Sequence, residues 1–312
     1  MGYLVEAELK NQLLNGAITK EKFETTNKRI SAVRKIGERN NSAYMDSDHL
    51  DVYVATSMRE RTDFWNVANF VDQVFNQKSL KPLKLRHFDP TQAYCKSRID
   101  KGLLEGLMLK RAKCTIYMGG ESDTLGKDSE LATTLAQGKP VIAYVPNFQS
   151  YEQFRKGYVN QVLQKLYSDD DPKDVALRFL QTYYPRGAWD DSKIRGWISD
   201  KNELPLEKAI KEIFDRANRL YDSRATALKQ LHPLGLQVNL ETGVANGVLV
   251  ARNVAECTHL LKGVLLNTLE FEIQHEKDCI ELREKHTGSL YRVMTKDSHL
   301  TNSFWNFYLR SR

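Results

Sequence analysis

The sequence predicts an α/β protein built on a doubly wound parallel sheet. Between residues 50 and 145, short runs rich in β-branched and aromatic residues alternate with stretches of helical periodicity. The last run, Val141 to Val145, is apolar throughout, which is typical of a strand buried between helices on both faces of a sheet. Gly119-Gly120 and Pro140 punctuate the alternation at positions where strands should end or begin. This pattern is the one expected of repeated strand–helix–strand units.

The N-terminal part is predicted to be helical over residues 5 to 39, with Gly16 dividing it into two helices. Polar residues around 40–42 and 46–48 then predict a linker. Within the α/β part we expect strands at 50–55, 83–88, 114–118 and 141–145, and helices at 63–75, 98–110 and 129–137.

The last third of the chain is predicted to be a separate α+β accessory domain. A long helix is expected over 206–230, and Asn253 with Glu256 has the spacing of a capping box. Residues 236–240 and 247–251 could form a hairpin. The expected division is an N-terminal helical segment at 1–47, the α/β domain at 48–200 and the accessory domain at 201–312.

Composition limits the classes of function. The chain has 312 residues and a net charge of +6, and its mean hydropathy is −0.53. No apolar run approaches the roughly 18 residues of a membrane span, and no secretory signal is visible, so we expect a cytoplasmic protein with no membrane partner. The four cysteines and seven histidines are dispersed, so neither a metal site nor a disulfide framework is expected.

Ligands of open parallel sheets bind beyond the carboxyl ends of the strands. The segments expected at that edge carry hydroxyl, guanidinium and carboxylate groups and exposed backbone amides, a mixture that suits a sugar–phosphate ligand. The candidate substrate-binding residues there are Thr56, Ser57, Arg59, Asp89, Gly120, Asp123 and Gly126.

Glu130 is the candidate for the chemistry. It is expected in the first turn of its helix, where the helix dipole and free amides would favour an ionised carboxylate. Such a carboxylate beside a nucleotide can attack the anomeric carbon, or stabilise an oxocarbenium-like centre as the base departs. Acidic residues are also common in first turns for capping reasons alone.

The segment from Asp123 to Ala132, followed by Ala136 to Ile142, resembles the signature of the nucleoside 2-deoxyribosyltransferase family. That family has a nucleophilic glutamate followed eight residues later by glycine, and Glu130 and Gly138 keep this spacing. The resemblance implies that Tyr53 is the aromatic residue of the first strand near the substrate. It also implies that Glu105, with Asp100 as the competing position, is the second carboxylate that holds the sugar hydroxyls.

The resemblance implies cleavage of an N-glycosidic bond, with NAD or a nucleotide as substrate and with no cofactor and no metal. The fold is related to that of TIR-type NAD-cleaving domains. The added segments are similar to those of antiphage effectors, retron-associated toxins among them, which favours a regulated toxin over a compact metabolic transferase. A non-catalytic nucleotide sensor is the rival of a different class. A regulatory protein, a nucleic acid contacted by the aromatic and basic C-terminus around Trp305, and a second copy of the chain stay open as partners.

Overall fold

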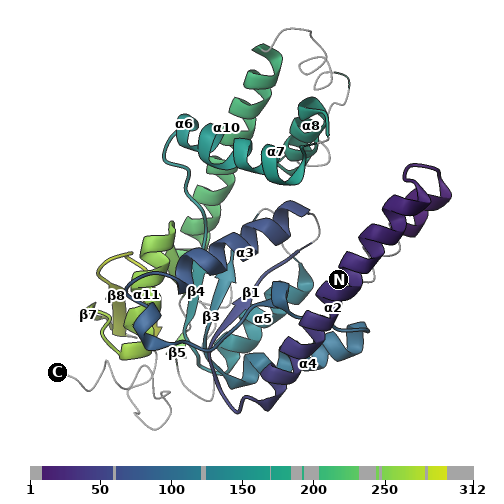
Figure 1. The fold of residues 1–312 in the computed structure, drawn as a ribbon. Helices are drawn as coiled ribbons and strands as arrows, with labels where there is room; N and C mark the ends of the chain where they lie inside the picture. The colour runs from purple at the N-terminus through teal and green to yellow at the C-terminus, as the bar shows by residue number, and fades with distance from the viewer. Residues whose placement is uncertain are drawn as a thin grey trace.

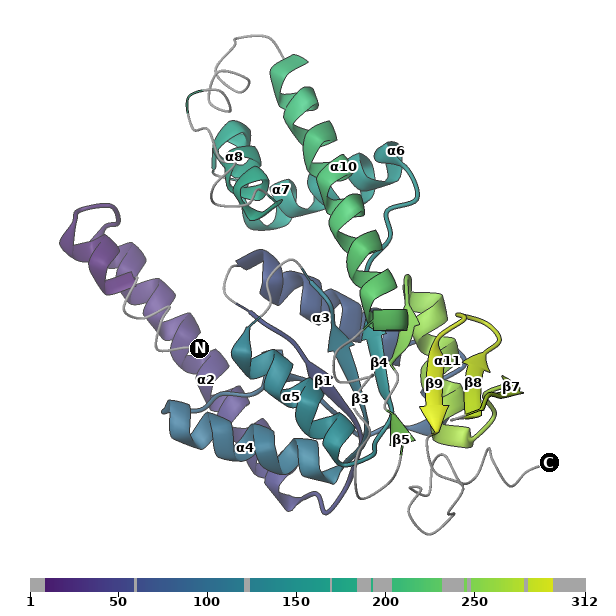
Figure 2. The ribbon, with the colours of Figure 1, turned by 180° about the vertical axis from the view of Figure 1, so that it is seen from behind.

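A five-stranded parallel sheet with the order β2-β1-β3-β4-β6 forms the centre of the molecule (Figures 1 and 2). The computed structural model describes residues 9–58, 61–120, 124–168, 170–183, 192, 204–231, 244–245, 248–277 and 280–293. The expected α/β fold with a doubly wound parallel sheet is confirmed. The strands are β1 (Leu50–Ala55), β2 (His87–Phe88), β3 (Ala112–Met118), β4 (Val141–Tyr144) and β6 (Leu249–Ala251).

Helices cover both faces of this sheet, and the alternation of side chains along β1 decides which residues meet them. Val52 and Val54 point into the core shared with α3 (Arg61–Phe75) and α11 (Val254–Leu266). Tyr53 and Ala55 point into the core shared with α4 (Arg98–Arg111), α5 (Leu125–Ala136) and α10 (Leu204–Thr226). Both cores are apolar, and every residue of β1 except the half-buried Asp51 is buried.

The strand order places a topological switch point between β1 and β3. The helix that follows β1 (α3) covers one face, and the helix that follows β3 (α5) covers the other. The connections therefore diverge at the carboxyl ends of these two strands and leave a crevice there, which is where ligands bind in open sheets of this order.

A helical unit stands beyond the carboxyl ends of the strands, where short helices lie beside the long helix α10 (Figures 1 and 2). Its core contains Phe154, Leu180 and Ile213. We call it the helical unit. It consists of α6 (Tyr151–Gln153), a π-helix η3 (Phe154–Val159), α7 (Asn160–Leu166), α8 (Pro172–Tyr183) and α10, which continues as a π-helix η5 (Ala227–Leu231).

The expected boundary at residue 200 divides the strands of one sheet. β6 follows α10 in the chain but pairs in parallel with β4, with Tyr144 opposite Ala251. Within the described residues β6 is an edge strand of the parallel sheet, and the first strand of the expected hairpin, 236–240, lies outside the described residues. An antiparallel sheet with the order β5-β9-β8-β7 does lie near the C-terminus. Its strands are β5 (Val244–Ala245), β7 (Phe271–His275), β8 (Ile280–Glu284) and β9 (Leu290–Val293).

Two further elements differ from expectation. The strand expected at 83–88 is reduced to β2, because Lys81–Leu83 form a 3-10 turn and Lys84 adopts a left-handed conformation with φ of 47°. The linker expected at 40–42 is instead part of the helix α2 (Lys20–Asp46). The Asn40 side chain donates to the Gln92 carbonyl at 2.9 Å, so this polar run serves to attach the helix.

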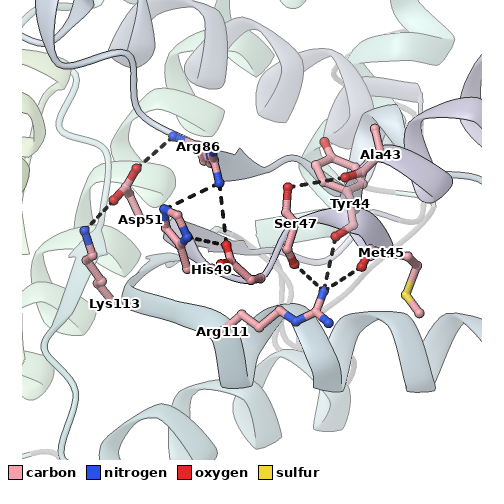
Figure 3. A network of polar contacts seen from close by, with 10 residues as sticks. Ala43, Tyr44, Met45, Ser47, His49, Asp51, Arg86, Arg111 and Lys113 are labelled. Atoms are coloured by element: carbon pink, nitrogen blue, oxygen red, sulfur yellow. Dashed lines mark hydrogen bonds and ion pairs between the residues drawn. The ribbon is translucent and has the colours of Figure 1, made fainter.

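The C-terminal end of α2 is held by one guanidinium (Figure 3). Nη1 of Arg111 donates to the carbonyl oxygens of Tyr44, Met45 and Ser47 at 3.3, 3.0 and 2.5 Å. The last carbonyls of a helix have no intrahelical partner, so a cation here satisfies them and opposes the helix dipole. Arg111 thus joins α2 to the end of α4.

We expect Arg111→Ala to lower the free energy of unfolding by about 1–3 kcal/mol, because the helix carbonyls lose a charged donor. Urea denaturation measures this change. The neighbouring exposed Lys110, replaced in Lys110→Ala, is the control and should leave stability within about 0.5 kcal/mol of the wild type. Equal effects of the two substitutions would show that the guanidinium does not hold the helix.

Candidate active site

A hydrogen bond between Tyr53 and Glu130 lies at the divergence of β1 and β3. The phenol of Tyr53 donates to Oε1 of Glu130 at 2.8 Å. Tyr53 is 1% exposed and stacks on Phe88 of β2, with ring centroids 5.3 Å apart, so its hydroxyl is fixed in position. Burial, with the Glu130 charge as the next cause, raises the pKa of Tyr53 well above its usual range, so it stays a donor.

Glu130 lies in the second turn of α5 and not in the first. Thr124 is the N-cap, and its side chain accepts from the backbone amide of Lys127 at 3.2 Å, so the helix begins before the expected start at Ser129. The helix dipole acts mainly within the first turn. The expectation that it would keep Glu130 ionised is therefore wrong.

Burial dominates the ionisation of Glu130 and raises its pKa to about 8. The nearby carboxylate of Glu105 raises the pKa further, whereas the Tyr53 hydrogen bond and the charges of Lys101 and Lys127 lower it. The carboxyl is therefore mostly protonated at neutral pH in the free protein. A shift of this size in a crevice is typical of a functional carboxyl.

The second oxygen of Glu130 has no protein partner. Oε2 is buried and has no hydrogen-bond partner among the described residues. A buried polar atom without a partner costs about 1–3 kcal/mol, so such atoms are rare in cores. Tyr53 holds Oε1, whereas the hydrogen-bonding capacity of the buried Oε2 is unused.

Of the two carboxylates expected near Glu130, the structure places Glu105 there. Glu105 forms an ion pair with Lys101 of the same helix at 3.3 Å, and its charge acts on Glu130. Burial raises the pKa of Glu105, and Lys101 opposes the rise. Asp100 is exposed and accepts from the Ser97 hydroxyl at 2.8 Å at the start of α4, which is a capping arrangement.

Two cavities flank this site. The larger, about 430 Å³, lies between α2 and the ends of β1 and β2, and Lys101 and Glu105 line it. The smaller, about 260 Å³, is lined by Thr56, Ser57 and Gly120 beside α3 and the helical unit. Neither lining includes Glu130, but its charge interacts with Glu105 in the wall of the first cavity and with Lys127 in the wall of the second.

The other candidates divide into structural residues and residues outside the described part. Asp89 is 4% exposed, and its Oδ1 accepts from the amide and the hydroxyl of Thr91 at 2.8 and 2.7 Å, so it caps the turn η2 (Pro90–Gln92). Gly126 is exposed in the first turn of α5. Arg59 and Asp123 lie outside the described residues, as does Trp305.

Sequence reasoning missed the two lysines of the site. Lys127 is 2% exposed, donates to the Met118 carbonyl at 3.2 Å and lies over the Tyr117 ring. Lys101 and Lys127 each lie close in sequence to one carboxylate, at (i, i+4) from Glu105 and (i, i+3) from Glu130. That helical spacing is the signal that could have found them.

Comparisons of the chain with protein-family models, with curated proteins and with solved structures found no match. Within the described part, no three histidine, cysteine, aspartate or glutamate side chains are grouped so that they could hold a metal ion. Among the same residues, no helix combines the length and the apolar character that crossing a membrane needs.

The raised pKa of Glu130 predicts how stability depends on pH. An unfolded glutamate ionises near its ordinary value of 4.5, whereas folded Glu130 stays protonated until about pH 8. Its contribution is therefore complete below pH 4.5 and is lost as the pH rises to about 8, at up to about 1.4 kcal/mol per pH unit. Glu130→Gln, which stays neutral, should gain stability relative to the wild type over this window.

Denaturant unfolding at several pH values measures this difference. Glu152→Gln is the control, because Glu152 is an exposed glutamate paired with Lys156 and burial does not dominate its pKa. A difference between Glu130→Gln and the wild type that is the same at pH 5 and pH 8 would contradict a buried, protonated carboxyl.

Proposed function

We propose that the chain cleaves the N-glycosidic bond of a nucleoside-type substrate, NAD or a nucleotide, and that Glu130 acts as nucleophile or stabilises the oxocarbenium-like centre. The observation that supports this most is the asymmetric environment of the carboxyl. Oε1 accepts from Tyr53, whereas Oε2 is buried at the switch point without a partner. The sequence resemblance to nucleoside 2-deoxyribosyltransferases supports the same chemistry.

The bonds would change as follows. A lone pair of the Glu130 carboxylate forms a bond to the anomeric carbon while the bond to the base breaks, and its electron pair leaves with the base. Water then attacks the anomeric carbon of the glycosyl ester, which frees the sugar, regenerates the carboxylate and releases one proton, and a base that leaves as an anion takes up a proton. Tyr53 orients the carboxyl through Oε1, and Glu105 would accept hydrogen bonds from the sugar hydroxyls. A second base in place of water would give the transferase outcome.

The protonated resting state of Glu130 favours a cationic glycoside. A positive charge close to a buried carboxyl lowers its pKa, so such a substrate would ionise Glu130 as it binds. The nicotinamide ring of NAD carries this charge, whereas an ordinary nucleoside develops it only as the bond breaks. NAD is therefore the first substrate to test. The defence-toxin role in the cytoplasm rests on the resemblance alone.

We expect the purified chain to release free base from NAD or from one member of a panel of nucleosides and nucleotides, as measured by chromatography. Glu130→Gln should lower turnover at least about a hundredfold while the fold is kept. Glu152→Gln should have no effect. Release only in the presence of a second base selects the transferase, and no release from any substrate, with the panel of candidates complete, favours the nucleotide sensor.

The pH dependence of kcat/KM separates a direct role of Glu130 from a structural one. Because the ionised form is required, kcat/KM should rise with pH toward a plateau above about 8. Tyr53→Phe removes a hydrogen bond that lowers the pKa of Glu130, so the midpoint should move to higher pH. Glu105→Gln removes a charge that raises this pKa, so the midpoint should move to lower pH. A midpoint that both substitutions leave in place would contradict the assignment.

A further inference from the structure

The smaller cavity has walls that the proposed chemistry at Glu130 does not use. We call it the switch-point pocket, and it is bordered by Thr56 and Ser57 after β1, Gly120 after β3 and Pro146 after β4. Most of the length of α3, from Asp63 to Gln73, forms one side, and the helical unit forms the opposite side through η3 and α10. The pocket therefore lies on the α3 side of the crevice, while Glu130 belongs to the α5 side.

Aromatic rings form much of its apolar surface. Phe148 and Tyr158 have ring centroids 5.7 Å apart, and Trp65 lies 6.3 Å from Tyr158. Tyr158 belongs to the π-helix η3, and π-helical turns are frequent at functional sites. Rings that border a pocket from two sides favour a flat, unsaturated ligand over an aliphatic one.

Three amide side chains line the pocket from one face of α3. Asn66, Asn69 and Gln73 recur at intervals of three and four residues, which places them in a row along that helix. Asn66 donates to the Tyr158 hydroxyl at 3.1 Å. The side chain of Asn69, which is half-buried, makes no hydrogen bond within the described part of the chain. An amide offers a donor and an acceptor side by side, the arrangement that pairs with the edge of a base.

The charges around the pocket argue against a phosphate there. Among the described residues that line it, only Asp63 and Lys127 are charged. Lys127 is occupied by the Met118 carbonyl and the Tyr117 ring. The volume of the pocket, about 260 Å³, lies below the ~300–1,000 Å³ of sites for drug-sized ligands. The pocket therefore fits one ring system and not a whole dinucleotide.

Lys127 connects the pocket to Glu130, because its charge acts on that carboxyl. Lys127 lines the pocket and precedes Glu130 by three residues on α5, so the two lie on the same face of that helix. A base in the pocket would thus place its sugar toward the Glu130 carboxyl.

We propose that the switch-point pocket binds a neutral nitrogen heterocycle with an adjacent hydrogen-bond donor and acceptor, and that Asn69 is its specificity-determining residue. That this heterocycle is the leaving base rests on the proposed function. Binding of the free base does not rest on it. Adenine and nicotinamide both carry the required edge, whereas purine and pyridine are the matching rings without the exocyclic group.

Titration calorimetry of the full chain with these four compounds tests the pocket. We expect saturable binding of adenine or nicotinamide and weaker binding of its matching ring. Asn69→Leu keeps the side-chain size but removes the amide, so it should weaken binding of the preferred base about tenfold or more and abolish the preference over the matching ring. The matched control is Asn76→Leu, because Asn76 is exposed just beyond α3 and bonds Asp72 outside this pocket.

The outcomes separate this inference from the proposed function. Absence of saturation up to about 10 mM, or equal effects of Asn69→Leu and Asn76→Leu, would overturn the base pocket. Glu130→Gln should still bind the base, so the pocket stands even if no substrate is cleaved. Conversely, a result in which base release depends on Glu130 while Asn69→Leu leaves KM and base preference unchanged would overturn the base pocket and support the proposed activity.

Discussion

The hydrogen bond from Tyr53 to Glu130 joins the first strand of the sheet to the helix that follows its neighbour. It spans the position where the two halves of the sheet diverge, and it takes one carboxyl oxygen into the protein's own structure. The other oxygen is buried and has no hydrogen-bond partner among the described residues, and the proposed chemistry rests on it. Because the carboxyl is buried and Glu105 adds a like charge, its pKa is raised to about 8, and the group is mostly protonated at neutral pH.

The two cavities beside Glu130 are lined by different kinds of side chain. On the α2 side, Lys101 and Glu105 supply charge, and on the α3 side, amides and rings supply shape and hydrogen bonds. The lysines that sequence reasoning overlooked, Lys101 and Lys127, belong one to each side, and both oppose the rise in the pKa of Glu130.

The sheet could be predicted from the sequence because its strands obey local rules. The strand at Leu50–Ala55 has the predicted bounds, and the capping box holds, since the Glu256 amide donates to Asn253 at 2.8 Å. The pairing of β6 with β4 could not be predicted, because nothing local in the run Leu249–Ala251 says which partner it takes. The ionisation of Glu130 was predicted wrongly for a similar reason. The start of its helix was expected at Ser129 and not at Leu125, and its pKa depends on residues of β1 and α4, which lie far from it in the sequence.

The role of Asn40 could not be predicted from the sequence either, because it depends on a tertiary contact. A run of polar residues between two apolar segments is typical of a linker, and only the tertiary structure provides the Gln92 carbonyl that turns it into an attachment point. Asp89 is a similar case, because a carboxylate after a strand is equally suited to capping a turn, as it does here, and to holding a ligand.

The insertion of the helical unit between β4 and β6 has a consequence for how the chain reaches its native state. The ribosome delivers β6 only after the whole unit, yet β6 must align against β4, which was synthesised much earlier. Contacts between distant parts of a chain require closure of a long loop, and the entropic cost of that closure slows folding. The nascent protein therefore carries β4 as an unprotected sheet edge until β6 has been synthesised. An early collapse of the helical unit would bring its two ends together and shorten the time that β6 then needs to reach β4.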